Sequence, residues 1–127
     1  MSQWCHVTGA IKIDINQCVK NTRKFLLKKL ADAPPIYGSE RNCDVFLNVL
    51  SGHNGSIYKG ADEWQEYQSC AAVTVVGDLR DTNLPTVKEE VMNFIDYIRK
   101  KHIEILEGVF VIYDELLEDP CIINITE

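Results

Sequence analysis

The chain has 127 residues, a net charge of −6, and 46% hydrophobic and 25% charged residues. These values are typical of one globular domain that buries its own hydrophobic core, and they favour neither a disordered chain nor a membrane protein. No run approaches the roughly 18 apolar residues of a spanning helix, and the first residues lack the pattern of a secretion signal. We therefore expect a single domain over residues 1–127, with no membrane contact and a cytoplasmic location.

The cysteines are odd in number, widely separated and mostly set in apolar segments, which is typical of reduced thiols in a core. They are Cys5, Cys18, Cys43, Cys70 and Cys121. Zinc sites need clustered ligands, whereas Cys5 and His6 are adjacent and would point to opposite faces of a strand. We expect no metal and no cofactor.

Charge is unevenly distributed along the chain. The segment Cys18–Asp32 is basic, whereas His102–Glu127 contains no lysine or arginine and is acidic. An acidic balance of this kind argues against a nucleic-acid partner, which needs a dominant basic surface. A basic stripe in this segment could contact an acidic partner or a nucleic-acid backbone, although such a stripe is usually only the solvated face of a helix. Its residues are Lys20, Arg23, Lys24 and Lys28.

The first half of the chain predicts two strands and one helix. Strict alternation over Cys5–Asp14 predicts a strand. Next, an apolar stripe predicts an amphipathic helix that ends at Ala33-Pro34-Pro35, with its members at helical spacing: Val19, Thr22, Leu26 and Leu30. Alternation from Cys43 to Leu50 predicts a second strand, and Gly52–Gln68 reads as a long connection, pinned back by Trp64 and Tyr67.

The second half predicts three strands and one helix. Small and β-branched residues over Cys70–Leu79 indicate a central strand. Thr86 with Glu89 fits a capping box that opens a helix ending near His102. Ile105–Tyr113 predicts a fourth strand, and Cys121–Ile125 predicts a short fifth strand that Pro120 marks as peripheral.

This order predicts an α+β fold: the ferredoxin-like βαββαβ arrangement, an antiparallel sheet with two helices on one face and an extra C-terminal strand. The other sheet face would be open and apolar, displaying His6, Ala10, Phe46, Leu50, Ala72 and Val76. Apolar patches of that size rarely stay in water. We expect the open face to be covered by a second copy of the chain, by the final strand and long loop, or by a partner, with His6, Phe46 and Leu50 as contact residues.

Two segments are candidates for a ligand site. The loop Tyr37-Gly38-Ser39-Glu40-Arg41 offers backbone N–H groups, a hydroxyl and a guanidinium to an anion such as a nucleotide phosphate, although a plain turn is the commoner use. The segment Gly77–Asp81 places Asp78 and Arg80 at a strand end, where a turn-capping carboxylate and a loop-fixing ion pair are commoner than catalysis. No nucleophile motif accompanies either segment, so we assign no catalytic residue.

Three strings carry a resemblance: Trp4-Cys5-His6-Val7, Tyr37-Gly38-Ser39-Glu40 and Gly77-Asp78-Leu79-Arg80-Asp81. Together they resemble a group of small uncharacterised proteins from tailed bacteriophages. The resemblance implies an accessory protein that acts in the cytoplasm of the infected bacterium, where many such proteins bind host defence proteins or their signalling nucleotides. It carries no catalytic residue.

These observations lead to one expected function with two alternatives. We expect a non-enzymatic phage-type accessory protein that binds a host protein, inhibits antiviral defence by that contact, and is a homodimer. The first alternative is sequestration of a small anionic ligand such as a signalling nucleotide. The second is a small hydrolase or nuclease-like enzyme that uses Asp78, Asp81 or His6.

Overall fold

The computed structural model describes residues 3–14, 22–48 and 70–126, and in helix α1 the side chains from Lys24 onward. Seven elements follow one another along the chain. They are β1 (Trp4–Asp14), α1 (Thr22–Ala31), β2 (Asp44–Asn48), β3 (Cys70–Arg80), α2 (Leu84–Lys100), β4 (Ile105–Asp114) and β5 (Cys121–Thr126). The expected strands and helices are therefore present in the expected order. The connection Gly52–Gln68, with Trp64 and Tyr67, lies outside the described residues, as do Val19, Lys20 and Leu50.

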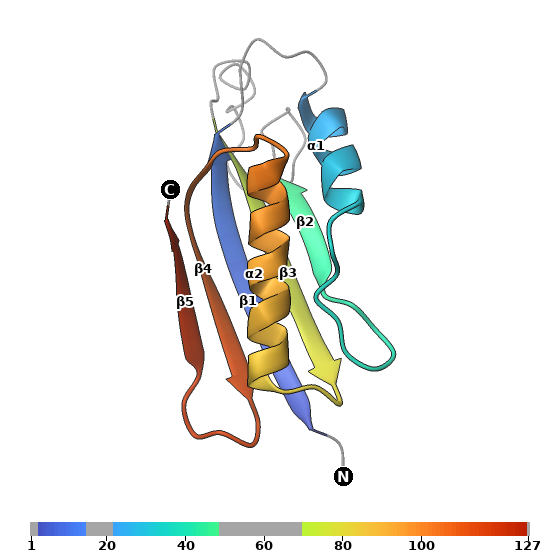
Figure 1. Ribbon diagram of the computed structural model, residues 1–127, viewed down its shortest axis with the longest axis vertical. Helices are drawn as coiled ribbons and strands as arrows, with labels where there is room; N and C mark the ends of the chain where they lie inside the picture. The colour runs from blue at the N-terminus through green and yellow to red at the C-terminus, as the bar shows by residue number, and fades with distance from the viewer. Residues whose placement is uncertain (1–2, 15–21, 49–69, 127) are drawn as a thin grey trace, which may run out of the picture.

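The strands form one antiparallel sheet in the order β2-β3-β1-β4-β5. Strand β1 lies in the middle and pairs over its whole length with β3 on one side and over most of it with β4 on the other (Figure 1). Because side chains alternate along a strand, odd-numbered β1 residues from Cys5 to Ile13 point into the core and even-numbered ones point away from it. The alternation that predicted this strand is confirmed residue by residue.

Both helices lie on the same face of the sheet, where α2 runs across its middle and α1 lies beside β2 (Figure 1). Helix α2 buries one stripe against the sheet, formed by Val87, Val91, Phe94, Ile95 and Ile98. Helix α1 contributes Leu26 to the same core, and the Tyr97 hydroxyl donates to the Lys29 carbonyl at 3.0 Å, which ties the two helices together. Phe25, which precedes Leu26 on α1, remains about half exposed.

The start of α2 corrects one sequence expectation. Asn83, not Thr86, is the N-cap: its side-chain oxygen accepts from the Thr86 backbone N–H at 3.0 Å, and Pro85 occupies the first turn. A proline fits there because the first N–H groups of a helix lack intrahelical partners. The predicted capping box of Thr86 and Glu89 is therefore wrong, because both residues lie inside a helix that begins at Leu84.

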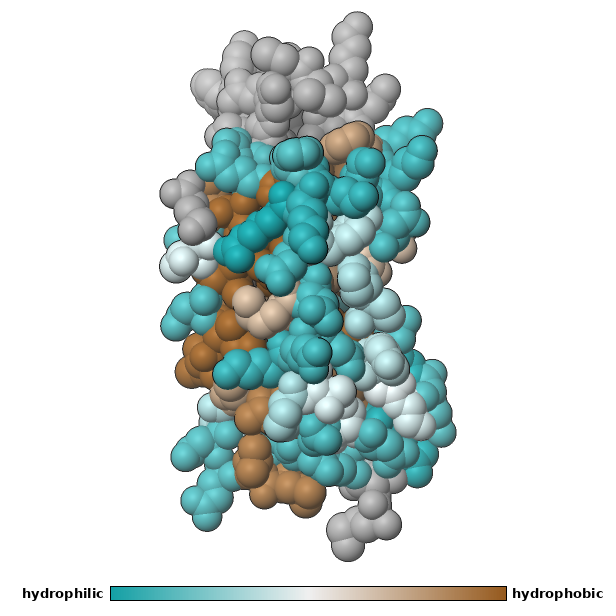
Figure 2. Space-filling view, viewed as in Figure 1, coloured by the Kyte–Doolittle hydropathy of each residue, from teal (hydrophilic) through white to brown (hydrophobic). Residues whose placement is uncertain are grey.

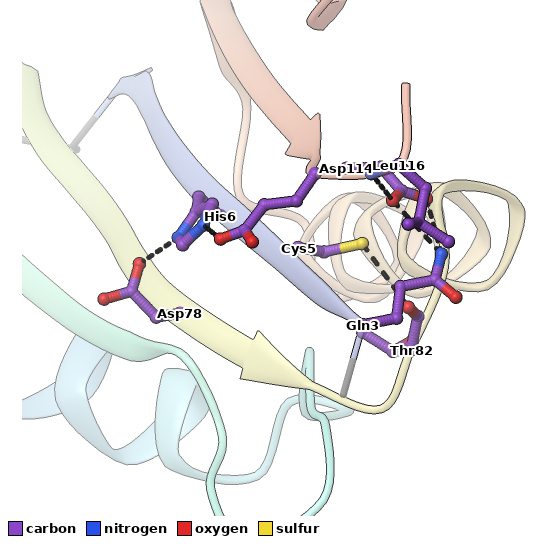
Figure 3. A network of polar contacts seen from close by, with 8 residues as sticks. Gln3, Cys5, His6, Asp78, Thr82, Asp114 and Leu116 are labelled. Carbon is purple, nitrogen blue, oxygen red and sulfur yellow. Dashed lines mark hydrogen bonds and ion pairs between the residues drawn. The ribbon is translucent and has the colours of Figure 1, made fainter. Parts of the chain in front are cut away.

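A buried carboxylate joins the end of β4 to the start of β1 and of α2. Asp114 is only 3% exposed. It accepts from the Gln3 side-chain amide and from the Leu116 backbone N–H (Figure 3), and also from the Leu84 backbone N–H, at 2.9 to 3.1 Å. A buried charge is tolerated only with such partners, so Asp114 fixes three chain segments at this end of the sheet.

The coarse fold class is confirmed, because the protein is α+β with a five-stranded antiparallel sheet and two helices. The sheet is not a plain four-stranded βαββαβ unit, since β5 extends it beyond β4. That position also settles one expectation about the open face: β5 lies in the plane of the sheet at its edge, and so it does not cover that face. In the part of the chain that the structure describes, no helix combines the length and the apolar character needed to cross a membrane.

Replacing Asn83 by Ala should lower the free energy of unfolding by about 1 kcal/mol, because the Thr86 N–H loses its acceptor. For a chain of this length that corresponds to a fall in Tm of roughly 3–5 °C, measured by differential scanning calorimetry. Thr86→Ala is the matched control and should change Tm much less, since its side chain does not cap the helix. The reverse ranking of the two variants would contradict the assignment of the cap.

Candidate functional site

The face of the sheet opposite the helices, here called the open face, is built from the even-numbered residues of β1 and their cross-strand neighbours. Register aligns these residues in rows that run across the strands. One row consists of Phe46, Thr74, Ala10, Val109 and Asn124. The next consists of Asp44, Val76, Thr8, Val111 and Ile122.

These two rows make an apolar centre. Ile122 is 61% exposed, Phe46 54% and Val76 43%, and Val109 is also exposed. The single charged residue in the two rows is Asp44, at the β2 edge. The expected apolar face therefore exists, with Ala10, Phe46, Ala72 and Val76 on it.

A shallow pocket of about 570 Å³ is hollowed into one end of the open face. Its lining is mostly small and apolar, with Ala10, Ala72 and Val109 among its residues, and Lys12 and Glu107 stand opposite each other at its side. Small side chains on neighbouring strands create the hollow because little atom volume stands above the backbone there. A protruding apolar group of a partner would fit into it.

A charged cluster closes the other end of the open face. His6 on β1 lies between two carboxylates: its Nδ1 is 2.6 Å from Asp78 on β3, and its Nε2 is 2.6 Å from Glu115, just after β4 (Figure 3). The Tyr113 ring stacks on the imidazole at a centroid distance of 6.0 Å. Register explains the meeting, since His6 stands opposite both Asp78 and Tyr113.

The two carboxylates favour the charged form of His6. Hydrogen bonds that Asp78 and then Glu115 accept from the ring raise the pKa of His6 above its ordinary value of 6.5, against a smaller opposing effect of burial. When the ring is protonated, both nitrogens donate to these carboxylates, and neither is then available to bind a metal ion. In the described part of the chain, no group of three or more His, Cys, Asp or Glu side chains is placed to hold a metal.

The structure brings the predicted ligand loop and Arg80 together, but in a self-contained arrangement. The loop docks on the end of β3, where the Ser39 N–H donates to the Arg80 carbonyl at 2.8 Å and the Gly38 N–H donates to the Arg41 carbonyl at 3.0 Å. The Tyr37 N–H is bound by Glu90 at 2.7 Å. Three amides that could have cradled a phosphate are therefore engaged within the protein.

The charged side chains of this region also pair with one another. Arg80 contacts the Glu40 carboxylate at 3.2 Å and the Asp81 carboxylate at 3.8 Å. Glu40 itself has a φ of 80°, in the left-handed region that glycine favours, so its backbone is fixed in an uncommon conformation. These contacts agree with the structural use of Arg80. Asp78 does not cap the turn after β3, because its carboxylate points to His6.

The buried thiols add no nucleophile. Burial raises the pKa of Cys5 to about 11 and that of Cys43 to about 12. Thiolates are the reactive form, so both residues stay protonated and inert at neutral pH. Cys5, Cys43 and Cys121 form no disulfide with another described residue, and Cys18 lies outside the described residues.

The candidate partner residues divide between surfaces. His6 and Phe46 lie on the open face, whereas Lys24 is exposed on α1, beyond the opposite face of the sheet. Glu115 and Tyr113 belong to the His6 cluster and escaped sequence reasoning, because only the β1–β4 register places them beside His6. No protein-family model, curated protein or solved structure matches the chain, so the resemblance to phage proteins stays a prediction.

The His6 cluster should make stability depend on pH. Because the folded pKa of His6 is raised above 6.5, the ion pairs contribute fully below pH 6.5 and their contribution is lost as pH rises through the folded value. All three side chains are well exposed, so the contribution should be under about 1 kcal/mol. His6→Asn should flatten this part of the pH profile of Tm.

NMR titration of the His6 ring gives the direct measurement. Asp78→Asn and Glu115→Gln should each lower the His6 pKa towards 6.5, since each removes one carboxylate partner, and Asp96→Asn on α2 serves as the control. A His6 that titrates alike in all four proteins would rule out the cluster.

Proposed function

We propose that this protein is a non-enzymatic binding module that docks a partner protein on the open face of its sheet. The observation that carries the proposal is the contiguous apolar centre of two cross-strand rows, with a pocket at one end and an ion cluster at the other. Protein interfaces have this anatomy, a core depleted of charge within a polar rim, and an exposed apolar patch of such extent marks an interaction site.

The rim indicates the chemistry of the partner. Carboxylates predominate around the apolar centre, with Asp44 and Asp78 on the β2–β3 side and Glu107 and Glu115 on the β4 side, and the whole chain carries a charge of −6. Complementary charge steers association and selects orientation. The partner that fits is a protein surface with a protruding apolar residue and a basic surround.

This proposal keeps the expected role of a phage-type accessory protein that binds a host protein and thereby inhibits defence. The resemblance suggests that setting, and the open face supplies a surface suited to it. Nucleotide sequestration is less well supported, because the N–H groups of Tyr37, Gly38 and Ser39 are already bonded. Hydrolysis is less well supported too, because His6 has both nitrogens on carboxylates.

We propose further that the sheet is an extended form of the ferredoxin-like arrangement. The ferredoxin-like arrangement is compatible with the sheet if β5 is an addition at the β4 edge and β2-β3-β1-β4 is the parent unit. In that arrangement the two helices cover one face of the sheet and leave the other face uncovered. The open face is then a consequence of the topology, available for binding without cost to the core.

A photo-crosslinking residue placed at Phe46 or at Val109 tests the proposal in bacterial cells. Both positions should crosslink to one protein other than this chain, and the matched control at Leu116, an exposed residue in the turn after β4, should not. The captured protein, once purified, should bind the wild-type chain and lose at least tenfold in affinity to Phe46→Asp. Such a loss is typical for the centre of an interface.

The variant Lys24→Glu distinguishes docking on the open face from docking on helix α1. It should leave binding unchanged, since Lys24 is on α1 and not on the open face. If Lys24→Glu abolished binding while Phe46→Asp did not, the basic helix would be the docking surface. A crosslink from Phe46 to a second copy of this chain would likewise contradict a separate partner.

A further inference from the structure

Strand β5 is an edge strand without the usual protection against pairing. Its sequence, Cys121–Thr126, contains no charged residue and no proline, and its register with β4 runs without a bulge. Edge strands of proteins normally carry a lysine, a proline or a bulge, because a bare edge is a template for another strand. Apolar side chains stand on both faces of β5, with Ile122 on the open face beside Asn124 and Thr126, and with Ile123 and Ile125 on the helix side.

The registers determine which backbone groups of β5 point outward. The Asp81 N–H donates to the Gln3 carbonyl between β3 and β1, and the Glu115 N–H donates to the Trp4 carbonyl between β4 and β1. Along an inner strand of an antiparallel sheet, successive residues bond alternately to the strand on one side and to the strand on the other. Since Glu115 bonds β1, the odd-numbered residues of β4 bond β1 and the even-numbered residues bond β5. Their partners are Cys121, Ile123 and Ile125, which leaves Ile122, Asn124 and Thr126 facing the free edge.

One of these outward groups is already occupied within the chain. Arg99, in the last turn of α2, donates to the Thr126 carbonyl at 2.5 Å. Ile122 and Asn124 therefore each present a backbone N–H and a carbonyl at the free edge. Neither group bonds another residue within the described part of the chain. The bonding capacity of the edge is concentrated at two residues that are two positions apart.

We propose that β5 pairs antiparallel with β5 of a second copy of the chain, about a two-fold axis at Ile123. In this register Ile122 of one copy and Asn124 of the other form a hydrogen-bonded pair, and symmetry repeats the pair. All the outward groups of both residues are then satisfied. The register keeps the helices of both copies on one side and joins the two open faces on the other.

Side chains at the shared edge are compatible with this pairing. Ile123 stands opposite Ile123 of the second copy, and Cys121 stands opposite Ile125, so no like charges meet. Figure 2, which shows the helix-bearing face, has its hydrophobic surface gathered on the side where β4 and β5 lie, beside the hydrophilic surface of α2. Pairing two such sides removes that apolar surface from water.

Charge complementarity at the two ends favours a second copy as the occupant. With the axis at Ile123, Pro120 of one copy stands opposite Thr126 of the other. The acidic turn that contains Glu118 and Asp119 therefore approaches the end of α2 that carries Arg99 and Lys100. A carboxylate of one copy then meets a cation of the other at both ends of the strand pair. This inference does not depend on the proposed function of the open face.

Disulfide trapping tests the register, on full-length chains in a Cys121→Ser background with diamide as oxidant. In Ile123→Cys the two thiols face each other across the axis in a non-hydrogen-bonded pair about 4.5 Å apart at Cα, within the range that a disulfide spans. The matched control Ile122→Cys places its thiols on a diagonal about 7–8 Å apart, too far to bridge. We expect a crosslinked dimer from the first variant only, and the opposite result, or no crosslink from either, would overturn the pairing.

Light scattering on the uncrosslinked protein gives an independent measurement. The wild type should have the mass of two chains, and Asn124→Pro that of one chain, 14.5 kDa, because proline removes an outward N–H without breaking a bond to β4. Phe46→Asp should remain dimeric, which separates this inference from partner docking on the open face. A wild type of single-chain mass, or a dimer that Phe46→Asp dissociates and Asn124→Pro does not, would overturn the proposal.

Discussion

The structure depends on one constraint: β1 is hydrogen-bonded along both of its edges. The face of the sheet on which each of its side chains stands is therefore fixed. Neither slippage nor rotation is available to a strand held by β3 and β4 together, since a shift of one residue would exchange the core and solvent faces. The core residues of β1 and the open-face residues of β1 are therefore consequences of the same alternation. The rest of the sheet takes its register from this strand.

The two charged features at one end of the sheet make that register specific. Buried Asp114 binds the start of β1 and of α2, while exposed His6 is bridged to β3 and to the turn after β4. The alternation of faces alone would still permit a shift of two residues, because such a shift puts one apolar side chain in the place of another. A carboxylate that must meet particular N–H groups does not, so these contacts stabilise a single arrangement.

The sequence predicted the strands and helices, which depend on the local periodicity of apolar residues. It did not predict the cross-strand contacts, which depend on register, or the helix cap, which depends on backbone geometry. Alternation over Cys5–Asp14 was sufficient to separate the core from the open face, because β1 is long and regular. The sequence placed the N-cap of α2 at Thr86 instead of Asn83. Both residues have a suitable side chain, and only the backbone conformation shows which of them caps the helix. Glu115 could not be assigned to His6, because a contact 109 residues apart leaves no local pattern.

The docking proposed for the open face and the pairing proposed for the edge of β5 use different chemistry, so the two would not compete. Side chains of the cross-strand rows make the open face, where a partner would be recognised by its shape and charge. Backbone groups of Ile122 and Asn124 make the edge, where only another strand satisfies them. Ile122 and Asn124 also end the two apolar rows, so pairing at the edge would continue those rows into the second copy. A partner with two equivalent sites would then bind such a dimer more tightly than a single chain, since its second contact would be intramolecular.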